Sequence, residues 1–86
     1  MSLPEKFREL ESWVDWALPT MRERSERRAS SNMDELQGFY NAVLPHLADI
    51  LAYMSTVPVE DDQEHNKKLL DLTKSLAEVA PAIELF

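Results

Sequence analysis

The stretch Met33–Met54 (MDELQGFYNAVLPHLADILAYM) decides the fold class of this chain. Its apolar residues recur at steps of three and four, at Met33, Leu36, Tyr40, Val43, Leu47, Ile50 and Met54. Because such steps place side chains on one face of an α-helix, the stretch predicts an amphipathic helix. The same spacing occurs before it, at Leu3, Phe7, Leu10, Val14, Ala17 and Met21, and after it, at Leu69, Leu72, Leu76, Val79, Ile83 and Phe86. Together the three patterns predict an all-α fold.

The ends of the three predicted helices follow from their capping residues and linkers. We expect one domain over residues 1–86, with helices over residues 4–28, 32–55 and 60–85. Pro4 suits a first helical turn, and Asn32 with Glu35 resembles a capping box. The acidic run over residues 60–64 suits the start of the third helix, because negative charge is favourable against the helix dipole there.

The short connections between these helices predict their arrangement. Helices joined by short loops alternate in direction, so we expect an up-down-up three-helix bundle, which two copies would extend into a larger bundle on dimerising. The second helix has the widest apolar face, because Phe39, Leu44 and Leu51 add to its stripe. We therefore expect it at the centre of the bundle.

Each predicted helix carries a proline in mid-run, at Pro19, Pro45 and Pro81. Each proline lies two residues from a core position on either side, so its ring is expected to face outward. A proline inside a helix removes one backbone hydrogen bond and bends the chain, which predicts kinked helices wrapped around the core. Two alternatives stay open: Pro19 ends its helix, or the carbonyl of Asn41 freed by Pro45 serves as an acceptor.

Composition narrows the classes of function. The 86 residues include one glycine and no cysteine, and the chain carries a net charge of −7. These values disfavour disulfides, thiolate chemistry, glycine-rich phosphate loops and nucleic-acid binding. No apolar run is long enough to span a membrane, so we expect a cytoplasmic protein without membrane partners. Asp62-Gln63-Glu64-His65 echoes the Glu-x-x-His motif of di-iron bundles, but it occurs once where two copies are needed, so we expect no metal and no cofactor.

His46 is the strongest candidate for chemistry. Asp49 lies three residues further on, and a histidine with a carboxylate on one helix face suits general base catalysis or metal binding. A boundary histidine beside a surface acid has the same pattern, and no nucleophile accompanies it. A pocket between kinked helices is the alternative, lined by Trp13, Trp16, Tyr40 and His46.

Surplus aromatic and basic residues predict an interface. Only one side of the first helix can face the core, so Trp13 and Trp16 are candidates for contact with a partner, as aromatic side chains often are. Tyr53 is a further candidate. The one basic cluster, Arg22, Arg24, Arg27 and Arg28, is diluted by Glu23 and Glu26 and suits docking of an acidic partner, with Arg22 and Glu26 as an i,i+4 pair.

Three segments carry a resemblance to a known group: Trp13–Met21 (WVDWALPTM), Met33–Met54 and Ser75–Phe86 (SLAEVAPAIELF). They resemble small bacterial helical proteins associated with gene clusters for Rieske-type aromatic-ring oxygenases. The chain lacks the Cys-His pairs of a Rieske cluster, so the resemblance implies an accessory role and transfers no functional residue. We therefore expect a non-catalytic interaction or accessory protein, a homodimer or a partner of another protein, with a small-molecule-binding or catalytic protein as the alternative.

Overall fold

The all-α prediction is confirmed in a computed structural model, which describes residues 2–85 and contains no strand among them. The elements in chain order are the 3-10 helix η1 (Glu5–Trp16), α1 (Met21–Ala29), α2 (Met33–Val43), the 3-10 turn η2 (Leu44–His46), α3 (Leu47–Met54) and α4 (Glu64–Glu84). Six elements thus replace the three helices that the sequence predicts.

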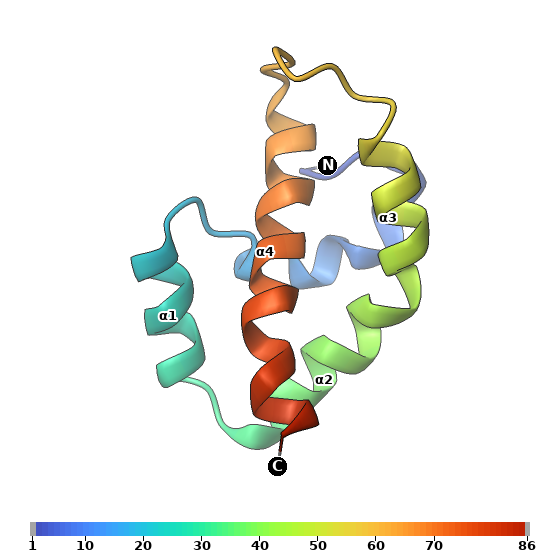
Figure 1. Cartoon of the computed structure of the whole chain (residues 1–86). Helices are drawn as coiled ribbons and strands as arrows, with labels where there is room; N and C mark the ends of the chain where they lie inside the picture. Colours follow the sequence, from blue (N-terminus) through green and yellow to red (C-terminus); the bar gives the residue numbers. More distant parts are fainter. Residues whose placement is uncertain (1, 86) are drawn as a thin grey trace.

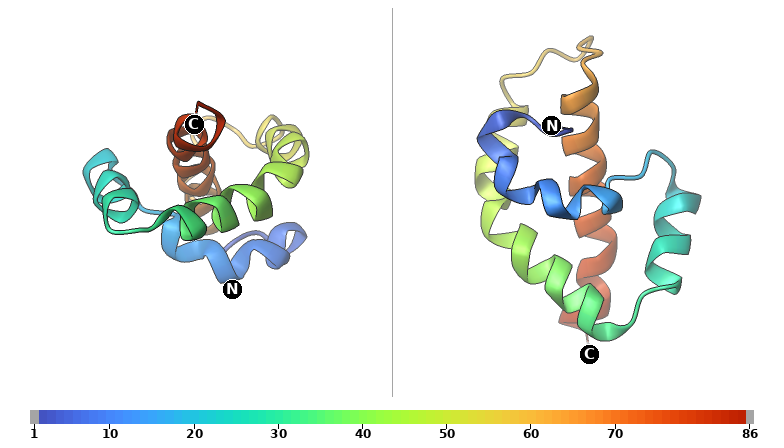
Figure 2. Two further views of the ribbon diagram at one scale, coloured as in Figure 1. Left: turned by 90° about the horizontal axis from the view of Figure 1, so that it is seen from below. Right: turned by 180° about the vertical axis from the view of Figure 1, so that it is seen from behind.

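The longest helix, α4, is the central element of the molecule. Its 21 residues extend over about 31 Å, most of the 36 Å long axis of the protein. It contacts η1, α2 and α3. Figure 1 shows α1 on one side of it and α2 and α3 on the other, and Figure 2 shows η1 crossing it. The prediction that the second helix is central is therefore wrong, and because η1 crosses α4, the elements do not form the expected up-down-up bundle.

The predicted apolar stripes lie inside the protein in part. In α4, Leu69, Leu72, Leu76 and Val79 are buried as predicted, and Phe86 lies outside the described residues. In the second stripe, Leu36, Phe39, Val43 and Ile50 are buried. Met33, Leu44 and Leu51 are exposed, which corrects their expected place in the core.

The first predicted helix, over residues 4–28, is broken at Pro19. The non-helical segment 17–20 separates η1 from α1. Proline has no N–H and pushes the preceding residue out of helical geometry, and Thr20 then begins a new helix as its cap, accepting a hydrogen bond from the Glu23 N–H at 3.1 Å. Pro19 therefore ends its helix, which is the alternative to the predicted kink.

The other two prolines differ from each other in their effect. Pro45 lies in η2, where α2 gives way to α3, so the expected helix over residues 32–55 is two helices joined by a turn. Pro81 lies inside α4, which continues to Glu84. All three prolines are exposed, as predicted.

The first predicted stripe is buried in part. Leu10, Trp13 and Trp16 recur at steps of three, and a 3-10 helix with three residues per turn places them on one line, whereas the backbone is kinked at Phe7. Leu3, Phe7, Leu10 and Ala17 are buried as predicted, and Trp16 is buried with them. Met21 lies in α1, beyond the break at Pro19, and is 70% exposed.

Two helix starts test the predicted caps. The capping box is confirmed, since Asn32 Oδ1 accepts from the Glu35 N–H at 2.8 Å and Glu35 Oε1 accepts from the Asn32 N–H at 3.4 Å. The third helix begins at Glu64 and not at residue 60. Before it, the Asp61 N–H donates to the Pro58 carbonyl at 3.0 Å, and this turn occupies the first residues of the acidic run.

Candidate interaction surface

Trp16 belongs to the core and not to an interface. Its side chain is 1% exposed, and its ring stacks on that of Phe39 with centroids 4.5 Å apart and an interplanar angle of 15°. The guanidinium of Arg27 lies 4.1 Å from the Trp16 ring centroid, a cation–π contact. The expectation that Trp16 contacts a partner is therefore wrong, because the period of three in η1 turns it inward.

Trp13 lies at the edge of the same aromatic cluster. Its ring is tilted against Phe39 at a centroid distance of 6.1 Å, and the side chain is half-buried. A Cβ atom at Gly38 would lie 3.4 Å from Trp13 Cη2, so the single glycine of the chain lets the indole approach α2. Trp13 therefore packs within the protein and presents only part of its surface.

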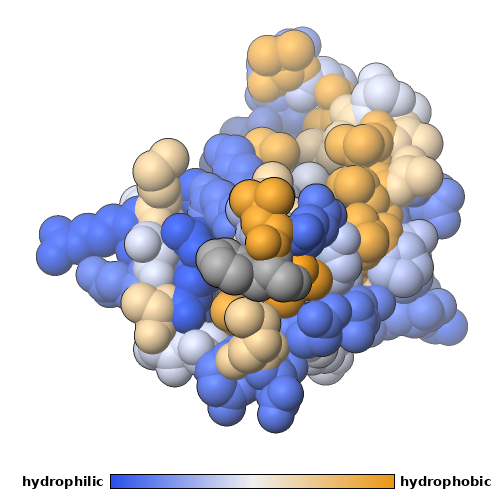
Figure 3. Space-filling view, turned by 60° about the horizontal axis from the view of Figure 1, so that its bottom comes forward, coloured by the Kyte–Doolittle hydropathy of each residue, from blue (hydrophilic) through white to orange (hydrophobic). Residues whose placement is uncertain are grey.

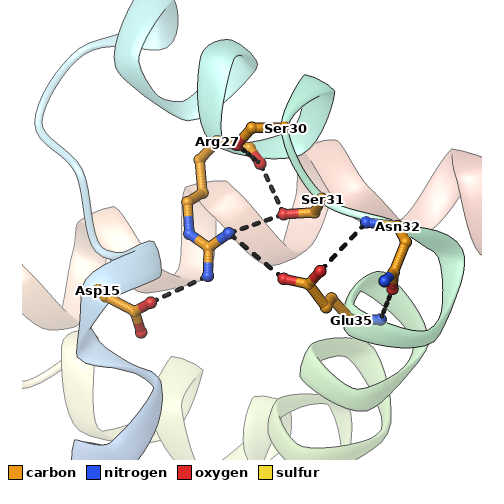
Figure 4. Close-up of polar contacts among 6 residues, drawn as sticks. All are labelled: Asp15, Arg27, Ser30, Ser31, Asn32 and Glu35. Carbon is orange, nitrogen blue, oxygen red and sulfur yellow. Dashed lines mark hydrogen bonds and ion pairs between the residues drawn. The ribbon is translucent and has the colours of Figure 1, made fainter.

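Arg27 joins three elements (Figure 4). Its Nη2 donates to Asp15 of η1 at 2.9 Å, and its Nη1 donates to the Ser31 hydroxyl at 2.7 Å. The same Nη1 lies 3.8 Å from Glu35, which caps α2. The side chain of Arg27 thus has its partners inside this chain.

Arg24 and Arg28 fasten α1 to α4 through Glu78. Arg24 Nε lies 3.0 Å from Glu78 Oε1, Arg28 Nη1 lies 2.9 Å from the same oxygen, and Arg24 also donates to the Leu18 carbonyl at 2.9 Å. Burial by itself raises the pKa of Glu78, but the hydrogen bonds and charges of the two arginines lower it below its usual value. Arg24 is only 5% exposed, so its predicted role in docking a partner is corrected.

Arg22 is the arginine of this cluster that stays at the surface. Its Nε lies 3.2 Å from Glu26 Oε1, which confirms the predicted i,i+4 pair. An exposed pair of this kind contributes little to stability. The basic cluster therefore attaches α1 to the rest of the protein through Arg24, Arg27 and Arg28. Arg22 and Glu26 form an exposed pair within α1 itself.

The two tyrosines are also engaged within the chain. Tyr53 donates its hydroxyl to Asn66 Oδ1 at 2.6 Å and packs edge-on against Phe7 with centroids 5.6 Å apart, so it is not the open interface residue that was expected. Tyr40 donates to Glu84 Oε2, and this hydrogen bond raises its pKa.

His46 and Asp49 do not form the expected pair. His46 is half-buried, and its Nε2 lies 4.0 Å from Glu9 Oε2 of η1. Asp49 is exposed. Within residues 2–85 no hydrogen bond or ion pair joins the two side chains. Over the same residues, no cluster of three or more histidines and carboxylates could hold a metal ion.

Two grooves lie elsewhere than the predicted pocket. One has a volume of about 200 Å³ and is lined by Met54, Val57, Pro58, Val59, Asp61, Asn66, Lys67 and Leu70. The other has a volume of about 160 Å³ and is lined by Leu44, Leu47, Thr73, Leu76, Ala77, Ala80 and Glu84. Both are smaller than the roughly 300 Å³ at which small-molecule pockets begin. None of the four residues of the predicted pocket lines either groove, and Trp16 is buried in the core.

One apolar surface is formed by one side of α3 together with η2. We define the α3 face as the exposed residues Leu44, Pro45, Ala48, Leu51, Ala52 and Ser55. Leu51 is 54% and Leu44 38% exposed, and Leu44 also lines the smaller groove. Figure 3 shows hydrophobic side chains gathered in a band on the side of the molecule that α3 occupies in Figure 1.

Charge is sparse along the segment from Leu44 to Thr56. Among the exposed residues from Leu44 to Thr56, Asp49 is the only charged one, although 29% of the whole chain is charged. The opposite side of α3 buries Ile50. A helix that is apolar on both sides is usually covered on both. The sequence signal for this surface is the run of thirteen residues from Leu44 to Thr56, which contains one formal charge. A search for surplus aromatic residues does not find this run.

The fold and this surface define a small all-α protein with an uncovered apolar helix face. None of the helices within residues 2–85 is long and apolar enough to cross a membrane. The chain matches no protein-family model, and neither curated proteins nor solved structures give a match.

Proposed function

We propose that this chain is a non-catalytic interaction protein, an accessory to other polypeptides, and that the α3 face is its binding surface. The observation that carries the proposal is the exposure of Leu44 and Leu51 in a segment whose exposed residues include one charged side chain, that of Asp49. A contiguous apolar patch of this kind costs solubility unless another surface covers it, and such patches mark sites of protein–protein contact.

The internal contacts of the expected interface residues support this choice of surface. Trp16 and Arg24 are buried, and Arg27, Arg28 and Tyr53 have partners within the chain. A partner at these residues would have to displace stacked, hydrogen-bonded groups. A partner at the α3 face displaces only water from apolar side chains, which is favourable in itself.

The partner is a second copy of this chain, another protein of the cytoplasm, or both. The resemblance to helical proteins of ring-oxygenase gene clusters supplies one class of partner to test, an oxygenase subunit. Nucleic acid is a poor partner for a chain with a net charge of −7.

The test is affinity capture of the tagged protein from its native host, with the wild type and two variants in parallel. Leu51→Lys places a charge in the α3 face, and Met21→Lys places the same charge on α1, where Met21 is 70% exposed. We expect capture of a stoichiometric chain by the wild type and by Met21→Lys, and its loss with Leu51→Lys. Equal capture by both variants would contradict the assignment of the surface, and an oxygenase subunit among the captured chains would support the accessory role.

A further inference from the structure

The contacts that hold α1 in place are polar. The only buried side chain of this helix is that of Arg24, and no residue of the apolar core lies between Met21 and Ala29. Figure 1 shows α1 beside α4, connected to the rest of the chain by a loop at each end. Detaching α1 therefore leaves the packing among the other helices in place.

Three arginines supply the contacts of α1 with the other elements. Arg24 and Arg28 lie 3.0 and 2.9 Å from the same oxygen of Glu78 on α4, and Arg27 donates to Asp15 of η1 at 2.9 Å. When an ion pair separates, water hydrates both charges and offsets much of the attraction that is lost. We therefore expect α1 to be held more weakly than α4, which buries a continuous apolar stripe.

The backbone on either side of α1 lets this helix leave as a unit. The non-helical segments 17–20 and 30–32 flank it. The helix has nine residues, fewer than the roughly 12–15 that an isolated helix needs in water. Once detached, α1 therefore loses its helical structure, and its backbone amides exchange with solvent.

We propose that α1 is a lid that opens as one unit while η1, α2, α3 and α4 stay folded. In the closed form, the guanidinium of Arg27 lies 4.1 Å from the Trp16 ring centroid. Opening removes this guanidinium and uncovers the indole, which stays stacked on Phe39. Such an opening costs less free energy than global unfolding, because most of the buried apolar surface is retained. The lid lies across α4 from the α3 face and acts independently of it (Figure 1).

Hydrogen exchange of single amides in the full chain is the first test. We expect the amides of α1 to exchange at least about 100-fold faster than the slowest amides of α4. Their exchange should also depend less on urea, because opening the lid exposes less surface than unfolding does. Equal rates with the same urea dependence would overturn the lid, since α1 would then open only when the whole protein unfolds.

A core variant separates opening of the lid from global unfolding. Ile50 is buried on α3, so Ile50→Val weakens the closed and the open form alike. We expect about 3- to 10-fold faster exchange of the slowest α4 amides and no change in α1. The same increase in both helices would overturn the proposal.

Glu78→Gln tests what holds the lid closed. It removes the charge that Arg24 and Arg28 share, so we expect all hydrogen-bonded amides of α1 to exchange faster by one common factor of about 10 or more. Arg22→Gln is the control, because the pair of Arg22 with Glu26 is exposed and lies within α1. It should change exchange by no more than about 2-fold. Unchanged exchange in Glu78→Gln, or an increase limited to the ends of α1, would overturn the lid.

Tryptophan fluorescence tests what the opening uncovers. The chain has two tryptophans, so Trp13→Phe leaves Trp16 as the only one. In this background we expect weak quenching by acrylamide, and stronger quenching once Arg27→Gln and Glu78→Gln are added, with most of the helical circular dichroism signal kept. Unchanged quenching would overturn the proposal. Loss of the whole helical signal would overturn it too, because the other elements would then not stay folded without α1.

Discussion

Trp16 shows how a single residue ties the first third of the chain to the rest. It stacks on Phe39 of α2 and lies under Arg27 of α1, so three elements meet at one indole. Stacked aromatic pairs contribute about 0.5–1.5 kcal/mol beyond the burial of their area. Most of the aromatic surface that the sequence predicts at an interface is therefore buried between elements of this chain.

Replacing Trp16 by alanine should destabilise the protein strongly. Because the side chain is 1% exposed, we expect a loss of about 3–5 kcal/mol in the free energy of unfolding. The measurement is urea unfolding followed by circular dichroism. Met21→Ala, at a position 70% exposed, is the control and should change stability by no more than about 0.5 kcal/mol. Similar small losses for both would show that Trp16 is not a core residue.

Glu78 makes stability depend on pH in a known direction. Its pKa is lowered in the folded protein, so the folded state binds fewer protons than the unfolded state, where glutamate titrates near about 4.3. Its stabilising effect is therefore present above about pH 4.3 and is lost as the pH falls through the folded value. We expect Glu78→Gln to lose about 1–3 kcal/mol at neutral pH and to show less acid sensitivity than the wild type. Parallel acid profiles for both proteins would contradict this role.

At the scale of elements, α1 and α4 are held in opposite ways. The only buried side chain of α1 is that of Arg24, so this helix is attached by ion pairs and hydrogen bonds. In contrast, α4 buries a continuous apolar stripe. Apolar periodicity therefore predicts α4 well and carries little information about α1, whose place depends on Glu78, fifty residues or more away in sequence.

The same substitution, proline to alanine, compares the roles of Pro81 and Pro45. Pro81 lies inside α4 and removes a backbone hydrogen bond there, whereas Pro45 lies in the first turn of η2, where a missing N–H costs little. We expect Pro81→Ala to raise the free energy of unfolding by about 2 kcal/mol, after the gain in unfolded-chain entropy is subtracted. Pro45→Ala should change it by about 0.5 kcal/mol or less. Thermal and urea unfolding measure both, and an equal effect of the two would contradict this difference.

At the scale of the whole molecule, net charge and the α3 face act against each other. Two chains of charge −7 repel, and an uncharged contact brings no compensating ion pair. The Debye length falls from about 10 Å at 0.1 M salt to about 3 Å at 1 M. Association through the α3 face should therefore strengthen with salt.

Sedimentation at increasing ionic strength measures this dependence. If two copies associate through the α3 face, we expect the dissociation constant to fall by about 3- to 10-fold between about 0.1 M and 1 M salt. A constant that rises with salt would instead indicate an ion-paired interface, such as one through Arg22, and would argue against the α3 face.

The sequence by itself determined the helical class, the cap at Asn32 and Glu35, the outward position of the prolines and the buried stripe of α4. Each of these depends on residues within about one or two turns, so local spacing is sufficient. Only the tertiary structure decided that η1 is a 3-10 helix that turns Trp16 inward, that Arg24 is buried against Glu78, and that Leu44 and Leu51 stay uncovered. These features depend on contacts between residues far apart in the chain, because packing against α2 and α4 selects which face of a local pattern is buried.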